Sequence, residues 1–392
     1  LITTIGIPIN TKKQQKNSQS TALSNTVKKI ELDNGLRIIM HPNNQAKSTK
    51  IQILTKAGIL SETTETNGIG SLTAKLLGTA TSKYNKEKIE TIIENHGAYM
   101  EGSTGYHTLY YTLDCLSEDI KTLAPLFFHT YFDAKFKDKY IKEEKRKQEN
   151  LIKRRQDDWF RYGSYTFKKQ FFKSHPYALA FSGELDSIKS LNKNSFENFH
   201  EKLLNPKHMI ISVMGNYDEK EIIDIIKSQS FNTKTINQSD LIIQRNANIN
   251  PTHLEHKFNT TSLFMGFKGV SLRDVNEKIK LDLLDTLLSG ASYPGGRLHN
   301  KLRDKGFVYL VHGVNFTGIY TGFYYIYALT NEDSYKDVNT LILNEIKSLQ
   351  ETPATDEEWQ EAIARLKFYY KDRASSSDSL ILIKAADELL LN

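Results

Sequence analysis

The segment NGIGSLTAKLLGT spans residues 67–79 and decides how the rest of the chain is interpreted. Its apolar residues Ile69, Leu72, Leu76 and Leu77 recur at helical spacing and form a single stripe. Taken alone, this pattern predicts an ordinary core helix. The segment becomes informative only when the elements and motifs on either side of it are added.

The composition is that of a globular protein with two or three domains. The chain has 392 residues, of which 25% are charged and 10% aromatic, and domains average about 150 residues. The net charge, 52 − 46 = +6, is mildly basic and does not by itself indicate a polyanionic partner. No apolar run approaches the roughly 18 residues of a membrane-spanning helix. The single cysteine, Cys115, excludes an internal disulfide framework and any multi-cysteine zinc site.

The order of predicted elements occurs twice along the chain. In each half, strands of alternating pattern are followed by helices, further strands and a long amphipathic helix, and a polar segment separates the halves. We therefore expect an α+β fold of two successive homologous domains, each a mostly antiparallel sheet packed with helices. The predicted divisions are an extended arm at residues 1–27, a first domain at 28–228, a linker at 229–250 and a second domain at 251–392.

Two other patterns could carry chemistry, and neither predicts a site. His253, Glu255 and His256 form the closest histidine cluster, but in an extended segment residues three apart point to opposite faces. The basic residues between Lys135 and Arg155 alternate with glutamates at helical spacing, which favours a solvated helix face. Because no base-stacking motif accompanies these charges, we expect no nucleic-acid partner.

The segment at residues 67–79 belongs to a longer pattern. Lys56-Ala57-Gly58 and Glu62 precede it, and the second half contains Gly296-Arg297-Leu298 followed by LRDKGFVY at residues 302–309. In order and spacing these motifs resemble the pitrilysin/insulinase family of zinc metallopeptidases, which includes the mitochondrial processing peptidases and their bacterial relatives. The resemblance extends from about Lys29 to the end of the chain. It implies that the two domains form half of a clamshell-shaped peptidase.

The resemblance also implies where a zinc site would lie. Family enzymes carry an inverted His-x-x-Glu-His motif on this helix, with a later Glu as third protein ligand. On this chain the two ligand histidines correspond to Ser71 and Lys75, the general base to Ala74, and the later Glu to Asn150 or Leu151. Serine is a poor neutral zinc ligand, alanine cannot take up a proton, and a lysine ammonium repels a divalent cation. We therefore expect that the chain binds no metal or other cofactor and hydrolyses nothing alone.

The second half retains a different part of the family's catalytic machinery, the substrate-binding Arg and Tyr. Active family members use an Arg and a Tyr from the second domain to hold the substrate, and Arg303 and Tyr309 correspond to that pair. Substrate peptide in this family adds to an edge strand, which corresponds here to residues 97–104.

The leading hypothesis is a non-catalytic subunit of a heteromeric zinc metalloendopeptidase, in which Arg303 and Tyr309 assist a homologous partner that carries the zinc. One alternative is a peptide-binding or scaffold pseudopeptidase with no hydrolytic role, like the family members built into respiratory complexes. Another is a divergent active metallopeptidase, and self-association is the alternative to a heterodimer. The expected location is the bacterial periplasm or the medium.

Overall fold

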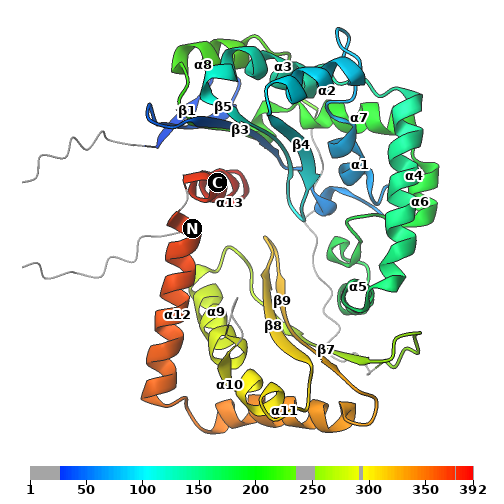
Figure 1. Ribbon diagram of the computed structural model, residues 1–392, viewed down its shortest axis with the longest axis vertical. Coiled ribbons are helices and arrows are strands. Elements are labelled where there is room, and N and C mark those ends of the chain that lie inside the picture. Colours follow the sequence, from blue (N-terminus) through cyan, green and yellow to red (C-terminus); the bar gives the residue numbers. More distant parts are fainter. Residues whose placement is uncertain (1–26, 235–251, 291–294, 376, 392) are drawn as a thin grey trace, which may run out of the picture.

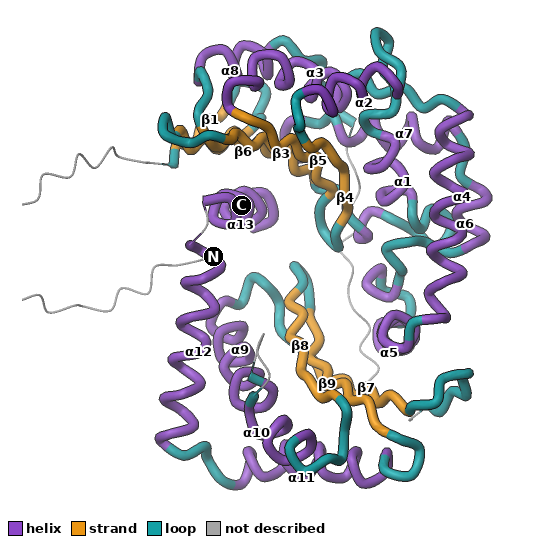
Figure 2. The backbone as a smooth tube through the Cα atoms, in the orientation of Figure 1, coloured by secondary structure: helices purple, strands orange, loops and turns teal. Residues whose placement is uncertain are grey.

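The computed structural model describes residues 27–234, 252–290, 295–375 and 377–391. All but the last residue of the predicted arm at 1–27, and most of the predicted linker at 229–250, lie outside the described residues. Two sheets face one another across the molecule, each with helices on its outer side (Figure 1), and Figure 2 shows the same two layers by secondary structure. Among the described residues, no helix combines the length and apolar character needed to cross a bilayer.

The first half contains six strands and eight α-helices. The strands are β1 (Lys28–Glu31), β2 (Arg37–Pro42), β3 (Ser48–Thr55), β4 (Tyr99–Thr104), β5 (Leu109–Leu116) and β6 (Met209–Gly215). The helices are α1 (Ile69–Leu76), α2 (Lys86–Asn95), α3 (Ile120–Phe132), α4 (Asp138–Arg154), α5 (Trp159–Phe172), α6 (Leu185–Ser190), α7 (Lys193–Leu203) and α8 (Glu219–Lys227). The sheet order is β1-β2-β6-β3-β5-β4, with only β2 and β6 parallel. β4 is therefore an edge strand.

The second half repeats this order in shorter form. Its described elements are β7 (Thr261–Lys268), α9 (Val275–Ser289), α10 (Gly296–Leu298), a π-helical turn (His299–Arg303), β8 (Leu310–Thr317), β9 (Gly322–Thr330), α11 (Tyr335–Glu351), α12 (Asp356–Ser375) and α13 (Ser377–Leu391). The sheet order is β7-β9-β8, and both pairings are antiparallel. The predicted α+β fold with two mostly antiparallel sheets is confirmed.

Both faces of the first sheet are buried. Ile38 and Met40 of β2 and Ile211 of β6 pack into the core formed with α1, α2, α3, α7 and α8. Their neighbours Ile39 and Ile210 point to the opposite face and pack into a separate cluster. A sheet that is buried on both faces needs a second cover.

The second cover of the first sheet is α13, which comes from the far end of the chain. Ile381, Ala385 and Leu389 lie four residues apart on one side of α13 and pack against this face. Arg37 Nη1 of β2 donates to the Glu388 carbonyl at 2.6 Å and to its carboxylate at 2.9 Å. Figure 1 shows α13 beneath the first sheet, between the two halves.

The second sheet is covered in the reciprocal way. One face packs against α9, α10 and α11, and the other against α5, a helix of the first half. Phe167 of α5 stacks on Phe264 of β7 with ring centroids 6.3 Å apart, and its ring fits closely over Gly266, which has no side chain to obstruct it. The strands of the two sheets thus lie within residues 28–215 and 261–330, and each sheet takes one covering helix from the other half.

His107 lies where the halves meet. Its Nε2 atom is 2.7 Å from the Tyr177 hydroxyl and accepts the backbone N–H of Ile319 at 3.3 Å, from the turn between β8 and β9. An Nε2 atom that accepts a hydrogen bond carries no proton, so the ring is neutral. Burial lowers the pKa of His107 to about 4.

This histidine predicts a loss of stability in acid. Because the pKa of His107 is near 6.5 in the unfolded chain and about 4 in the folded one, its contribution is present above pH 6.5 and is lost as the pH falls through 4. Between pH 7 and pH 4.5 this amounts to about 2 kcal/mol. We expect His107→Gln, which does not titrate, to lose correspondingly less stability on acidification in urea denaturation. His175, whose pKa burial also lowers to about 4, remains in both proteins and cancels in the comparison. Equal acid sensitivity of the two proteins would contradict this assignment.

Candidate functional site

Helix α1 begins at a buried carboxylate. Glu62 is 4% exposed, and its oxygens accept the N–H of Gly68 at 2.8 Å, the N–H of Gly70 at 3.0 Å and the Asn67 amide at 2.8 Å. Gly68 has φ +95°, which a side chain would strain. Burial raises the pKa of Glu62 to about 7, while these donors oppose that shift. Glu62 thus satisfies the free N–H groups at the start of α1 and fixes where the helix begins.

A chain of hydrogen bonds joins α1 to α4. Lys75 Nζ donates to Gln148 Oε1 at 2.7 Å, and Gln148 Nε2 donates to Ser71 Oγ at 3.3 Å and to the Ser182 carbonyl at 2.9 Å. Ser71 and Lys75 are one helical turn apart and face α4 together. Gln148 is fully buried, so its amide links α1, α4 and the segment that contains Ser182.

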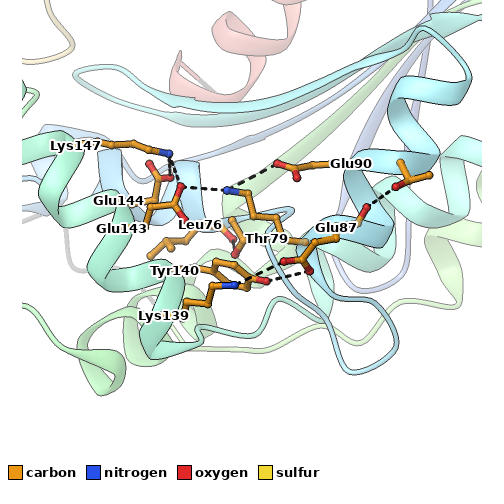
Figure 3. Close-up of polar contacts among 11 residues, drawn as sticks. Leu76, Thr79, Glu87, Glu90, Lys139, Tyr140, Glu143, Glu144 and Lys147 are labelled. Atoms are coloured by element: carbon orange, nitrogen blue, oxygen red, sulfur yellow. Dashed lines mark hydrogen bonds and ion pairs between the residues drawn. The ribbon is translucent and has the colours of Figure 1, made fainter.

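Charged residues hold α4 against its other neighbour, α2. Lys139 and Tyr140 of α4 lie beside Glu87 of α2 (Figure 3), and Lys86 of α2 lies 3.3 Å from Glu143 of α4. Lys147 pairs with Glu143 and Glu144 within α4 itself, at 2.8 and 2.7 Å. Burial lowers the pKa of the Lys75 ammonium, and the Glu144 carboxylate opposes that shift. Contacts to α1 and α2 together set the rotation of α4 and hence the place of Gln148.

The edge strand β4 lies directly against α1. A Cβ atom on Gly102 would overlap the Ala74 carbonyl oxygen and lie 2.8 Å from its carbon. Ala74 itself is buried, at 1% exposure, and contributes only a methyl group. At position 74, α1 therefore carries no side chain that could act as a base.

Sequence profiles of one peptidase family cover most of the chain. Residues 37–180 match the family described as Insulinase (Peptidase family M16), and residues 190–366 match the Peptidase M16 inactive domain. The chain belongs to the insulinase family. The predicted resemblance is thereby confirmed, and the match to a domain described as inactive agrees with a degenerate member.

Relatives and solved structures agree with this assignment. An uncharacterized zinc protease of Bacillus subtilis is 24% identical over 376 residues, which is 93% of this chain and 88% of the relative. The crystal structure of a peptidase M16 inactive domain from Pseudomonas fluorescens superimposes with TM-score 0.80 and 19% identity, covering 93% of this chain and 88% of that one. A protease from Helicobacter pylori gives TM-score 0.79 and 17% identity, covering 94% and 90%. At these identities the structures show the shared fold alone.

The side chains at the predicted metal position do not suit zinc. Zinc sites in proteins use thiolate, imidazole and carboxylate ligands, whereas this position offers an ammonium, a neutral amide and a hydroxyl. The Lys75 ammonium donates to Gln148 Oε1, and its positive charge would repel a cation placed beside it. Within the part of the chain that the structure describes, no group of three or more His, Cys, Asp or Glu residues could hold a metal ion.

Gln148, rather than Asn150 or Leu151, is the residue of α4 that meets α1. Asn150 and Leu151 come two and three residues later, a rotation of about 200° and 300° around a helix, and both are exposed, Leu151 by 41%. The structure therefore does not bring them to Ser71 and Lys75. The sequence contains one signal for Gln148. Glu144, Gln148 and Ile152 lie four residues apart on the buried side of α4, so Glu144 and Gln148 are polar residues at positions where an apolar residue is expected.

Arg303 and Tyr309 meet one another in the second half. Arg303 Nη1 donates to the Tyr309 carbonyl at 2.9 Å, and the Tyr309 side chain is 61% exposed. The pair precedes β8, whereas the turn that contacts His107 follows it, about 25 Å further along the strand. Among the described residues, no hydrogen bond or ion pair joins the pair to Ser71, Lys75 or Gln148.

Proposed function

We propose that this chain is a non-catalytic subunit of a heteromeric zinc metalloendopeptidase. The observation that carries the proposal is the hydrogen-bond chain from Lys75 through Gln148 to Ser71, which fills the family's metal position with groups that neither bind zinc nor activate water. Hydrolysis would then depend on zinc held by a homologous partner.

The proposed contribution of this chain is the Arg303 and Tyr309 pair. Both side chains are exposed at the surface of the second half, where a partner can reach them. A guanidinium and a phenol are hydrogen-bond donors suited to the negative charge that develops on a peptide carbonyl oxygen during attack by water. In this proposal they stabilise that oxygen while the partner supplies the metal and the base.

The edge strand β4 supports a role in holding the peptide. Only β5 pairs with it among the described strands, so its other edge has backbone groups that an extended peptide can pair with. Backbone pairing at β4 would bring a peptide alongside α1 without any need for metal.

Mixing this chain with a zinc-bearing homologue tests the subunit role. We expect the mixture to cleave unfolded peptides faster than either chain alone, and Arg303→Ala or Tyr309→Phe to lower kcat of the mixture by roughly 100-fold, as for loss of an oxyanion donor. Lys305→Ala, which removes an exposed cation two residues from Arg303, is the matched control and should leave the rate unchanged.

Other outcomes identify the alternatives. If the homologue cleaves equally well alone, the chain is a scaffold or peptide-binding protein. If Arg303→Ala and Tyr309→Phe leave turnover unchanged, the assisting role is wrong. Stoichiometric zinc and hydrolysis by the purified chain would establish a divergent active enzyme instead.

A further inference from the structure

Lys168 of α5 is a partly buried cation without a carboxylate partner. Its Nζ atom donates to the Tyr106 hydroxyl at 3.1 Å and lies 5.7 Å from the centroids of both the Tyr106 and Phe181 rings. No ion pair joins it to an acidic residue of the described chain. Burial, together with the charge of Arg155, lowers the pKa of Lys168 to about 8. An ammonium that is held only by a phenol and aromatic rings can still form an ion pair with an anion.

Arg155 is a second cation near Lys168, and one of its guanidinium nitrogens has no acceptor. Its side chain is 13% exposed, its Cζ atom lies 3.9 Å from the centroid of the Tyr165 ring, and its Nη2 atom donates to Glu184 at 3.0 Å. Its Nη1 atom is buried and has no hydrogen-bond partner. This guanidinium nitrogen can therefore donate to a further acceptor without giving up the bond to Glu184.

Glu184 cannot neutralise both cations. One of its oxygens accepts from Arg155, and the other accepts from the Tyr165 hydroxyl at 2.5 Å. Lys169 adds a third positive charge, since it donates to the same Tyr165 hydroxyl at 3.0 Å. Three cations thus share one carboxylate, and the cluster keeps a net positive charge.

The cluster lies at the end of the edge strand. Tyr106 follows Thr104, the last residue of β4, by two positions. On the other side, Phe181 contacts the Tyr106 ring at 4.6 Å and precedes Ser182, whose carbonyl accepts from Gln148. An extended peptide paired with β4 would therefore run toward Lys168 at one end.

From this arrangement we infer that Arg155 and Lys168 form a carboxylate-binding subsite for the peptide that adds to β4. The inference rests on the proposed peptide-holding function and names the substrate class: peptides with a carboxylate beyond the segment that pairs with β4. A planar carboxylate matches the donor geometry of a guanidinium, and an ammonium is a suitable further donor to it. The carboxylate can be an acidic side chain or the C-terminus of the peptide.

Fluorescence anisotropy on the full chain tests the subsite. The probe is an unstructured fluorescent peptide in four forms: with one glutamate and a free C-terminus, with that glutamate changed to glutamine, with an amidated C-terminus, and with both changes. We expect one of the single changes to weaken binding at least 10-fold, which identifies the source of the carboxylate. Lys168→Met should weaken the binding of the unmodified peptide by a similar factor and leave that of the doubly modified peptide within twofold.

Lys153→Met is the matched control, because it removes the same charge from an exposed position of α4 two residues before Arg155. We expect it to change peptide affinity less than twofold. Lys168→Met should also unfold at no lower temperature than the wild-type chain, since it removes a desolvated charge that has no carboxylate partner.

Two results would overturn the subsite: equal binding of all four peptides, or equal losses from Lys168→Met and Lys153→Met. Absence of binding by every peptide form would overturn it together with the peptide-holding role at β4. Carboxylate-dependent binding combined with an inactive mixture of chains would instead count against the subunit role and leave the subsite standing.

Discussion

The quadruple variant Ser71→His, Ala74→Glu, Lys75→His, Gln148→Glu is expected to bind about one zinc ion per chain, whereas the wild-type chain should retain none after dialysis. The geometry for this change is already in place. Ser71 and Lys75 face α4 from successive turns of α1, and Gln148 lies 3.3 and 2.7 Å from them. Ligand atoms around tetrahedral zinc are separated by about 3.3 Å, since each lies roughly 2.0–2.2 Å from the metal.

Metal analysis and thermal unfolding both report the result. A ligand present at 1,000 times its dissociation constant stabilises the folded state by about 4 kcal/mol, which corresponds to a rise in Tm on the order of 10 °C for a domain of this size. The wild-type chain should show no such rise with zinc, because its ammonium at Lys75 opposes a second cation.

A matched variant separates the two possible third ligands. It carries the same three substitutions on α1, but Asn150→Glu in place of Gln148→Glu. Because Asn150 is exposed on another side of α4, this variant should bind zinc at least 100-fold more weakly. Tight binding by the Asn150→Glu variant, with none by the Gln148→Glu variant, would mean that α4 is rotated relative to its described position.

Local patterns predicted the helices around the site well. The periodicity of residues 69–77 and 86–95 corresponds to α1 at Ile69–Leu76 and α2 at Lys86–Asn95. Both signals are local, because an amphipathic stripe and a following glycine lie within a few turns of chain. The sequence YMEGST of β4 carries no such pattern, and only the family resemblance placed an edge strand there. Its strand conformation depends on pairing with β5 and on the close approach of α1.

Long-range packing could not be obtained from periodicity. The reciprocal exchange, in which α5 covers the second sheet and α13 the first, joins residues far apart in the sequence: Phe167 and Phe264 are 97 positions apart, and Arg37 and Glu388 are 351 apart. The third partner of the site was missed for a related reason. A shift of two residues along α4 turns a side chain by about 200°, so a spacing carried over from a family cannot distinguish Gln148 from Asn150.

Gly102→Ala is expected to destabilise the chain by more than about 3 kcal/mol in urea denaturation. The added methyl group would overlap the Ala74 carbonyl oxygen and lie 2.8 and 3.0 Å from the carbonyl carbon and Cα of the same residue. All three atoms are backbone of α1, so no side-chain rotation relieves the overlap. Either β4 separates from α1 or the helix moves, and both changes disturb the hydrogen bond between Lys75 and Gln148.

Gly105→Ala provides the control for this prediction, since it adds the same methyl group three residues later. The nearest atom to that methyl group is the Thr108 carbonyl oxygen at 3.7 Å, which is ordinary contact, so we expect a change within about 0.5 kcal/mol. A neutral Gly102→Ala would show that β4 does not lie against α1. Since the close packing of β4 on α1 would place a paired peptide beside that helix, that result would also remove the structural basis for a peptide site beside Ser71 and Lys75.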